Sequence, residues 1–538
     1  MEKQLIVRNH CNGMDPDEVI ETILKTRGVG NVEEFLSPLD LEDVLNKYQL
    51  HNMESATEIL LDAIKNNKKI FLNVDSDTDG VTSGAIMYRW LKAAYTAPDW
   101  HISQGKSHGT SRELIEKLSK KQYDVLIIVD SLDADTERYK VIRDMGIKII
   151  VLDHHDIDRD VPYSDYITLV SSADNYDNPE LAGAGVAWKF CNHMDEILGT
   201  QEAGYLMDLA ACGLVSDMTS VLSEENRTII DCGLKYANNP CIKKIVGGFD
   251  FNAQSFTFSV APLVNATCRY SQNDLAFKAM ISDDTKEISS LVKEMKKLKD
   301  KQNEEIADLM DDATEQAGHQ EDKKVLFIVI ETKAGIAGLL ANKLTNTYQK
   351  PVIVVQETDA GYAGSARGYG VKDFKDLCLK TNLCWGQGHG NAFGIKISYE
   401  DCDAFLDLLN QEMKDITFKT VIEVDAEIDL NDISDSLIDE VKKIDRISGE
   451  GFPSLKFLVY CDSFEAETVT KGKHLRCNPY DGMAFLKWNS GNLIEEFDDY
   501  SVTGERVGFI GSLDSGFWGR KWLRKMVFDE YIVNEVNK

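Results

Sequence analysis

The chain has 538 residues, which is too long for one hydrophobic core and predicts about three domains. A net charge of -31 argues against general binding of duplex nucleic acid, which relies on Lys and Arg, but it leaves open a local basic cleft on an acidic body. No stretch is apolar enough to span a bilayer, and the first residues lack the apolar segment of a signal peptide. The 11 cysteines include no Cys-x-x-Cys pair, so we expect a cytoplasmic protein with reduced thiols.

The predicted elements begin with a polar, helical extension over residues 1–65, with helix starts near Asp15 and Asp40. From 66 to 284, short β-branched apolar runs alternate with helical patterns, which is typical of a doubly wound α/β domain around a parallel sheet. Residues 285–322 contain one long charged helical stretch with a single apolar stripe. This stretch predicts a connecting helix, with a coiled-coil or binding role as the alternative.

A second, smaller α/β domain is predicted over 323–418, with strands at 325–330 and 352–356 around a helix at 336–348. After this domain the pattern changes to short alternating segments. Residues 419–538 therefore predict a small all-β domain, built as a barrel.

Acidic and His residues follow three of the apolar runs, at 69–74, 123–129 and 147–152. In a parallel sheet the carboxyl ends of the strands face the ligand crevice. Carboxylates gathered there repel one another unless a cation lies between them, so the pattern predicts a metal site, with two metals. The residues concerned are Asp75, Asp77, Asp79, Asp130, Asp153, His154 and His155.

The first of these segments also has the features of a phosphate site. Gly80 permits a tight turn into the next helix, whose N-terminus, with Thr82 and Ser83, suits a phosphate oxygen. A calcium loop is the weaker alternative, because the EF-hand Glu is missing and a strand precedes the motif. His beside carboxylates favours manganese over magnesium. Asp217 ends a small-residue helical run and, on its own, is equally a cap or turn residue.

These four segments, in this order, resemble the DHH phosphoesterase superfamily, named for the set carried here by Asp153, His154 and His155, and within it the RecJ-like exonucleases specific for single-stranded DNA. The resemblance implies a DHH domain, a DHH-associated domain with a Gly-His loop and a C-terminal OB-fold. It covers the chain from residue 65 to residue 530. Further segments that carry it are 181–189, 225–227, 261–269, 364–367, 388–394, 449–457 and 473–475.

The resemblance implies that Asp75 and Asp130 hold one metal. It implies that Asp77, Asp130, His154 and Asp217 hold the second, with Asp130 shared between the two. These ions are expected to be manganese, with magnesium as the alternative.

By the same resemblance, Asp79 supports the metal shell and acts with Asp130 and His155 in catalysis, where His155 hydrogen-bonds the scissile phosphate. Arg suits phosphate because it offers bidentate contact, although Arg269 and Arg367 could instead form surface salt bridges. The residues expected to bind substrate are Thr82, Ser83, Lys106, Asn265, Arg269, Arg367, Gly388 and His389.

In the C-terminal domain, basic residues and tryptophans are expected to guide a single strand, as OB-folds do through basic grooves and stacking aromatics. The tryptophans are equally candidates for the core. The expected path consists of Lys473, Arg476, Trp518, Arg520 and Lys521, with Lys471, His474, Trp522, Arg524 and Lys525 beside it.

The chain departs from the family pattern at Ser76 and Thr78, over 105–111, and at Gln387. These changes leave the expected metal ligands unchanged. They affect the residues that are expected to bind substrate and to select one end of the strand.

The function expected from the resemblance is an exonuclease that releases mononucleotides from one end of single-stranded DNA, the 5′ end if RecJ-like, in repair, recombination or replication. A monomer without membrane attachment is expected, with a single-strand-binding protein or a helicase as partner. A phosphodiesterase for short oligonucleotides or cyclic dinucleotides is disfavoured by the segment after 419. A non-catalytic DNA-binding scaffold is disfavoured by the complete set of acids and His.

Overall fold

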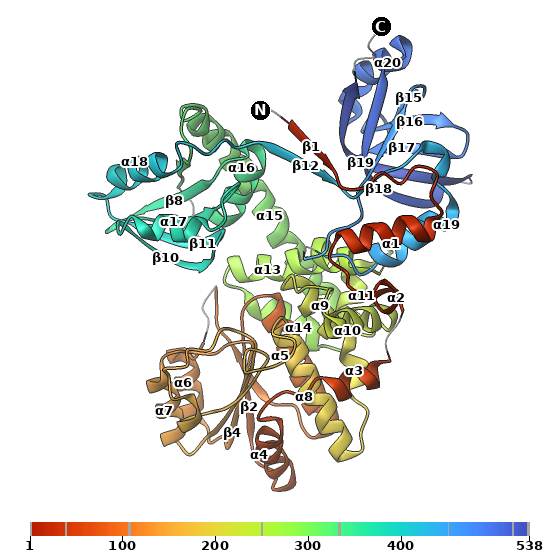
Figure 1. The fold of residues 1–538 in the computed structure, drawn as a ribbon. Helices are drawn as coiled ribbons and strands as arrows, with labels where there is room; N and C mark the ends of the chain where they lie inside the picture. Colours follow the sequence, from red (N-terminus) through yellow and green to blue (C-terminus); the bar gives the residue numbers. More distant parts are fainter. Residues whose placement is uncertain are drawn as a thin grey trace.

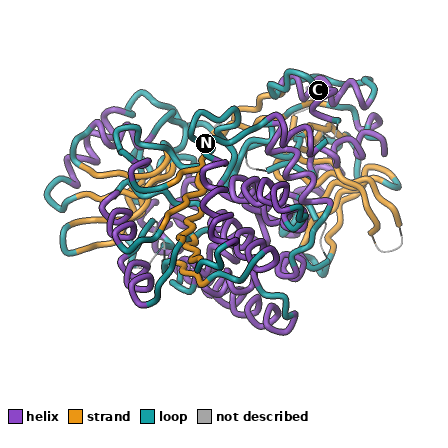
Figure 2. Tube along the Cα trace, turned by 90° about the horizontal axis from the view of Figure 1, so that it is seen from below, coloured by secondary structure: helices purple, strands orange, loops and turns teal. Residues whose placement is uncertain are grey.

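The computed structural model of the protein has three lobes (Figure 1). The long helix α15 (Thr285–Gly318) runs from the lobe formed by residues 53–281, called the catalytic lobe, to the second domain. Figure 2 shows strands in separate groups around a central block of helices. The structure describes residues 3–37, 40–105, 109–248, 251–331, 335–449, 451–518 and 521–534. None of the helices described there combines the length and the apolar character needed to cross a bilayer.

The catalytic lobe is built on a five-stranded sheet of order β3-β2-β4-β5-β6, in which every pairing is parallel. Every residue of β2 and β4 is buried, as their largely apolar sequences predict, with Asn73 of β2 as the polar exception. The three strands predicted from apolar runs are confirmed as β2, β4 and β5. The strands are β2 (Ile70–Val74), β3 (Asp99–Ile102), β4 (Val125–Val129), β5 (Lys148–Asp153) and β6 (Thr168–Ser171).

Helices cover both faces of this sheet. Leu72 and Ile127 pack with α5 and α8 on one face, whereas Leu126 and Ile128 pack with α6 and α7 on the other. Helix α9 is buried along most of its length and packs against α5 and α8. The helices are α4 (Met53–Lys65), α5 (Thr78–Ala94), α6 (Arg112–Lys120), α7 (Thr136–Asp144), α8 (Gly183–Leu198), α9 (Met207–Ser216), α10 (Glu224–Lys235), α11 (Pro240–Val246), the π-helical η3 (Phe256–Val260), α13 (Ala261–Arg269) and α14 (Asn273–Ile281).

The predicted connecting helix is α15 (Thr285–Gly318). Ile288 and Val292, near its start, belong to the catalytic core, and Ala313 and Ala317, near its end, belong to the core of the second domain. One continuous helix thus joins two hydrophobic cores.

The second domain has a five-stranded sheet of order β10-β11-β9-β8-β7, parallel only between β7 and β8. Helix α16 covers one face, and α17 and α18 cover the other. The elements are β7 (Leu326–Val329), α16 (Ala337–Tyr348), β8 (Val352–Thr358), β9 (Gly361–Arg367), α17 (Phe374–Lys380), β10 (Cys384–His389), β11 (Ala392–Ile397) and α18 (Cys402–Glu412).

The C-terminal lobe contains a seven-stranded mixed sheet of order β13-β14-β18-β19-β17-β16-β15. Among the described residues, β13 and β15 end this sheet and do not pair with each other, so a closed barrel is not confirmed. The elements are β12 (Thr420–Val424), β13 (Ala426–Glu427), α19 (Asp435–Asp445), β14 (Phe457–Cys461), β15 (Glu465–Val469), β16 (His474–Tyr480), β17 (Met483–Lys487), α20 (Ile494–Thr503), β18 (Arg506–Trp518) and β19 (Lys521–Asn534).

The N-terminal extension is not purely helical, because β1 pairs in parallel with β12. The helix starts predicted near Asp15 and Asp40 are confirmed, since these residues are the N-caps of α1 and α3. Helix α1 packs on α19, which ties the extension to the C-terminal lobe. The elements are β1 (Lys3–Val7), α1 (Pro16–Thr26), α2 (Val32–Leu36) and α3 (Leu41–Lys47).

Candidate metal centre

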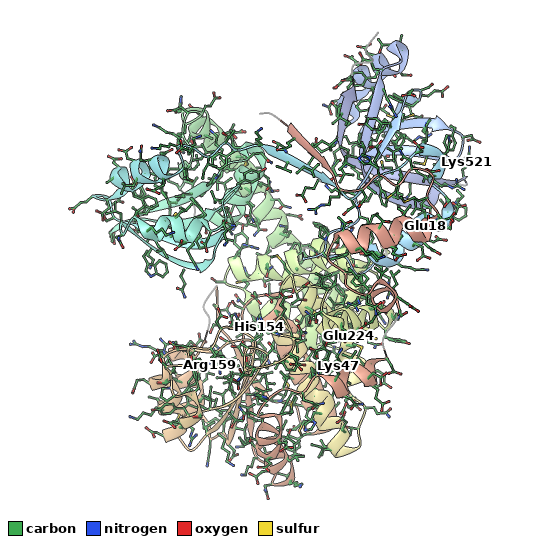
Figure 3. All side chains as sticks on the ribbon, in the orientation of Figure 1. Glu18, Lys47, His154, Arg159, Glu224 and Lys521 are labelled. Carbon is green, nitrogen blue, oxygen red and sulfur yellow. The ribbon has the colours of Figure 1, made fainter. Side chains whose placement is uncertain are left out.

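The predicted acidic residues meet at the carboxyl end of the catalytic sheet. Asp75 follows β2, Asp130 follows β4 and Asp153 ends β5. The strand order reverses between β2 and β4, because β3 lies on the far side of β2, and ligands of open α/β sheets bind at such a reversal. Figure 3 shows His154 beside the ends of these strands.

Three groups of side chains each bring their ligand atoms within 4.8 Å of one another. Since the groups share Asp130 and His154, they form one continuous site. The groups are Asp75 with Asp77 and Asp130, Asp79 with His154 and Asp217, and Asp130 with His154 and His155.

Asp79 is buried at the N-terminus of α8. The N–H of Gly183 donates to its Oδ2 at 2.7 Å, and the N–H of Ala184 donates to its Oδ1 at 3.0 Å. A helix N-terminus stabilises negative charge. Burial nevertheless raises the pKa of Asp79 well above its ordinary value, and the charges of Asp217 and Asp77 raise it further.

Asp130 has an unusual backbone conformation and a buried carboxylate oxygen. Its backbone is left-handed, with φ 56°, an uncommon conformation for a residue with a Cβ. Its Oδ1 is buried and accepts no hydrogen bond in the described part of the chain. Burial raises the pKa of Asp130 well above its ordinary value, and the charges of Asp79, Asp77 and Asp75 add to this.

A divalent cation fits this environment, because it would give the bare oxygen of Asp130 a partner and offset the repulsion among the carboxylates. Gly183 leaves room for it, since a Cβ there would lie 2.6 Å from Asp130 Oδ1.

The two adjacent His side chains have different surroundings. His154 Nε2 lies 3.2 Å from Asp130 Oδ1 and 3.8 Å from Asp79 Oδ2, and its Nδ1 lies 3.7 Å from Asp217 Oδ2. His155 instead donates from Nδ1 to Asp153 Oδ1 at 2.8 Å. His154 is thus surrounded by candidate ligands, whereas His155 is held by an acid behind the site.

The hydrogen bond to Asp153 raises the pKa of His155 to about 9, against the effect of burial. Burial alone would raise the pKa of Asp153, but the hydrogen bond and charge of His155 outweigh burial and lower it. The pair therefore presents a protonated, half-exposed imidazole to the site.

The grouping of Asp77 and Asp79 differs from the expected division of ligands. Asp79, expected to support the shell, lies with His154 and Asp217, and Asp77, expected in that set, lies with Asp75. Asp77 is also the N-cap of α5, where the N–H of Gly80 donates to its Oδ1 at 3.0 Å. The expected division of ligands between the two ions stays a prediction.

Comparisons with known proteins agree with this site. Residues 69–214 match the DHH family, N-terminal domain, and residues 322–415 match the DHHA1 domain. The chain is 30% identical, over 80% of its length and 79% of the relative's, to a putative prophage-derived single-strand DNA-specific exonuclease, YorK, of Bacillus subtilis. The chain belongs to the DHH family.

Other similar proteins place it among the RecJ-like members of that family. It is 26% identical to the single-stranded-DNA-specific exonuclease RecJ of Bacillus subtilis, over 96% of this chain and 68% of RecJ. The crystal structure of RecJ with Mn²⁺ from Thermus thermophilus superposes with a TM-score of 0.78 at 22% identity, covering 99% of this chain and 80% of RecJ. This DHH protein is a RecJ-like, metal-dependent phosphodiesterase. The similar RecJ structures from Thermus thermophilus contain Mn²⁺ or Mg²⁺.

Two arginines of the DHH protein approach each other from different domains. Arg269 ends α13, and its Nε is buried without a hydrogen-bond partner in the described residues. Arg367, at the end of β9, donates from Nε to Asn342 Oδ1 at 2.6 Å. Burial lowers the pKa of both groups, and the charge of Arg269 lowers that of Arg367 further.

Neither arginine forms an ion pair in the described part of the chain, so the expected alternative of a surface salt bridge is not observed. Lys299, on α15, faces the same cluster, since burial and then the charges of Arg269 and Lys343 lower its pKa. Sequence analysis missed Lys299 and Lys343, because a lysine at ordinary helical spacing carries no signal of its own. These two arginines and two lysines form a cationic cluster that could bind an anion between the two domains.

Two of the expected substrate residues are corrected by the structure. Thr82 and Ser83 are fully buried, and Thr82 Oγ1 donates to the backbone oxygen of Thr78 at 2.9 Å. Both hydroxyls face inward because α5 is covered by α9, so neither reaches a substrate in this structure. Asn265 remains at the site, where its Oδ1 accepts a hydrogen bond from Thr78 Oγ1 at 3.1 Å.

The Gly-His loop lies at the end of β10, opposite Arg367. The backbone of His389 pairs with Ala392, which pairs in turn with Arg367. Gly388 has φ 130° and a Cβ there would lie 2.9 Å from the backbone oxygen of Ala392, so the turn requires glycine. Lys106 and the side chain of His389 lie outside the described residues.

The expected basic path in the C-terminal lobe is largely neutralised by carboxylates. Arg476 donates to Glu467 at 2.8 Å, Lys521 pairs with Asp481, and Arg524 pairs with Asp435 at 2.8 Å. Lys525 also pairs, with Asp514, at 2.6 Å. Lys473 is exposed, and Lys521 lies far from His154 in Figure 3.

Of the two tryptophans expected in or beside this path, Trp522 has a side chain that the structure describes. Trp522 is 48% exposed and packs edge-on against Phe517, so it is not a core residue. Arg520 and the side chain of Trp518 lie outside the described residues.

Proposed function

We propose that this DHH protein is an exonuclease that hydrolyses single-stranded DNA from one end, in the 5′ to 3′ direction, and releases mononucleotides. The observation that supports this most strongly is that the acidic cluster around Asp130 is accompanied by two buried arginines, Arg269 and Arg367, which come from two domains and form no ion pair among the described residues. Cations satisfy the acids, and a phosphodiester strand supplies anions for both arginines. DNA repair, recombination or replication is the setting that the RecJ likeness suggests.

The metal ligands are proposed from the groups that the side chains form. One cation would be held by Asp75, Asp77 and Asp130, and the other by Asp79, Asp130, His154 and Asp217. Divalent cations at such a site neutralise charge on a phosphate and activate water for attack on phosphorus.

The protein's own residues hold and orient the strand. The protonated imidazole of His155 donates a hydrogen bond to the scissile phosphate, and Asp153 keeps this ring charged and in place. Arg269 and Arg367 hold a neighbouring phosphate, where Arg offers two parallel donors. The catalytic step breaks one P–O bond and adds water across it, and these contacts keep the phosphate fixed while negative charge develops.

The C-terminal sheet is proposed to be an OB-fold that guides the rest of the strand. Its pairing pattern and its exposed Phe517 and Trp522 support stacking on bases rather than attraction by free cations. Binding to a single-strand-binding protein or a helicase remains part of this proposal.

End-labelled single strands test the proposal. With manganese, the 5′ label is expected to appear first as a mononucleotide, while a 3′ label stays on strands that shorten stepwise. A matched reaction in EDTA is expected to release nothing. No mononucleotide from either end would rule the proposal out, and cleavage of dinucleotides but not of long strands would point to a small-substrate phosphodiesterase.

A further inference from the structure

The sheet of the second domain carries an exposed tryptophan beside a lysine. Lys396 Nζ lies 4.9 Å from the centroid of the Trp385 ring. Trp385 is 48% exposed, and Lys396 is exposed too. A lysine over an indole face gains a cation–π attraction, which holds the ring in one orientation.

The strand register places this pair on the same face as Arg367. Trp385 pairs with Lys396, which pairs with Ala363, and His389 pairs with Ala392, which pairs with Arg367. Directly paired residues project to the same face, as do residues two apart along a strand. Ala363 and Arg367 are four residues apart on β9, so the pair lies roughly 13 Å from Arg367 along the strand direction, on the next two strands of the sheet.

Between Trp385 and Arg367 this face carries Ser365, Gly394 and Ala392, together with the exposed Gln387, which pairs with Gly394. Helix α16 covers β8 and β9, where its Leu340 and Leu344 pack with Val354 and its Gly338 lies against Ser365 and Arg367. The strands β11 and β10 therefore form the uncovered part of this face, beside α16.

The ends of these strands also form a hollow of about 560 Å³, lined in part by Tyr362, Trp385 and Lys396. This volume lies within the range of roughly 300–1,000 Å³ that is usual for small-ligand sites. In Figure 1, β10 and β11 lie on the side of the second domain that faces the catalytic lobe.

We propose that Trp385 and Lys396 form a base-stacking subsite for single-stranded nucleic acid, and this rests on the proposed function. A nucleobase stacks on the open indole face, and Lys396 attracts the phosphate beside it. The strand occupies the face because a flat ring and a cation match a base and its phosphate, and because β10 and β11 are not covered by α16. The base belongs to a different nucleotide from the one whose phosphate meets Arg367.

The variants Trp385→Ala and Trp385→Phe test the subsite in the full chain with manganese. The measured quantity is the ratio of KM for a dinucleotide to KM for a long single strand. Because stacking of one base contributes about ten-fold to binding, this ratio is expected to fall about ten-fold in Trp385→Ala and to stay near the parent value in Trp385→Phe. Tyr236→Ala, which removes another exposed aromatic ring, is the matched control.

A single abasic nucleotide moved along the long strand distinguishes stacking from a structural effect. The parent is expected to show a raised KM at one abasic position, and Trp385→Ala is expected to be insensitive there. If the parent cleaves strands and Trp385→Ala keeps the parent ratio and sensitivity, the subsite alone is overturned. If the parent cleaves no strand, the proposed function and the subsite are both overturned.

Discussion

His155 Nδ1 donates a 2.8 Å hydrogen bond to Asp153 Oδ1, which places a fully buried carboxylate behind a half-exposed imidazole. The second oxygen of Asp153 is buried and has no hydrogen-bond partner in the described residues. The hydrogen bond with Asp153 and the charge of this acid raise the pKa of His155 to about 9. The ring remains a cation at neutral pH, ready to bind a phosphate.

Asp153→Asn should lower kcat/KM about 10–100-fold, since removing a carboxylate behind a functional His costs this much in related sites. The alkaline limb of the pH–rate profile should move to lower pH, because His155 without the charge of Asp153 loses its proton at a lower pH. Steady-state rates across pH measure both effects. The exposed neighbour Asp156→Asn is the control, and an unchanged profile in Asp153→Asn would show that His155 does not act as a cation.

Gly183→Ala should weaken metal binding, because the added Cβ would lie 2.6 Å from Asp130 Oδ1 and 2.9 Å from Asp130 Cβ. The rise in the midpoint of thermal unfolding on addition of manganese is the readout. It should be largely lost in Gly183→Ala and kept in Gly204→Ala, where a Cβ meets nothing within 4 Å. Equal rises in both variants would mean that Asp130 does not bind the ion.

Removal of metal should destabilise the parent protein. By mass action, manganese at a hundredfold excess over its dissociation constant stabilises by about 2.7 kcal/mol per site. The gain should be larger at pH 8 than at pH 5.5, because Asp79 and Asp130 have raised pKa values and protons compete with the ion for them more strongly as the pH falls. Calorimetry with manganese and with EDTA at both pH values tests this, and a larger gain at pH 5.5 would contradict it.

Asp445 gives a pH dependence of stability away from the metal centre. Burial raises the pKa of Asp445 to about 7 from an ordinary value of 3.8, and the N–H of Leu455 donates to its Oδ1 at 3.0 Å. The folded state binds the proton more tightly than the unfolded state, so stability falls as pH rises from about 4 to about 7. Above pH 7 the carboxylate is charged in both the folded and the unfolded state, and its burial then lowers the free energy of unfolding by a constant amount.

Asp445→Asn keeps the acceptor and removes the charge. The variant should gain about 2 kcal/mol in the free energy of unfolding at pH 8, after allowance for partial exposure, and almost nothing at pH 4.5. Urea unfolding at the two pH values measures this, with the exposed Asp439→Asn as control. The same gain at both pH values would mean that Asp445 is ionised throughout.

Local patterns in the sequence were sufficient to predict three strands of the catalytic sheet, since β2 and β4 are apolar apart from Asn73 and are followed by Asp75 and Asp130. The pairing of β1 with β12 was missed, because it joins segments more than four hundred residues apart, as Leu5 with Ile422, and no local pattern encodes such a pairing.

The acids of the metal centre were predicted by their place at strand ends, and their division between two ions stays a prediction. Asp77 and Asp79 are two residues apart, and only the turn into α5 decides which ligands each one joins. The basic residues near the C-terminus looked free in sequence because their partners are distant, as Asp435 is from Arg524. Burial of Thr82 and Ser83 likewise depends on α9, which follows much later in the chain.

Asp130→Asn tests the central claim most directly, since Asp130 is shared by two of the three ligand groups. Manganese stoichiometry by isothermal titration and nucleotide release from end-labelled single strands are measured together on parent and variant. The parent should bind two ions and release mononucleotides, and the variant should bind fewer and cleave on the order of a hundredfold more slowly. A variant that cleaves as fast as the parent would contradict the assignment of this site.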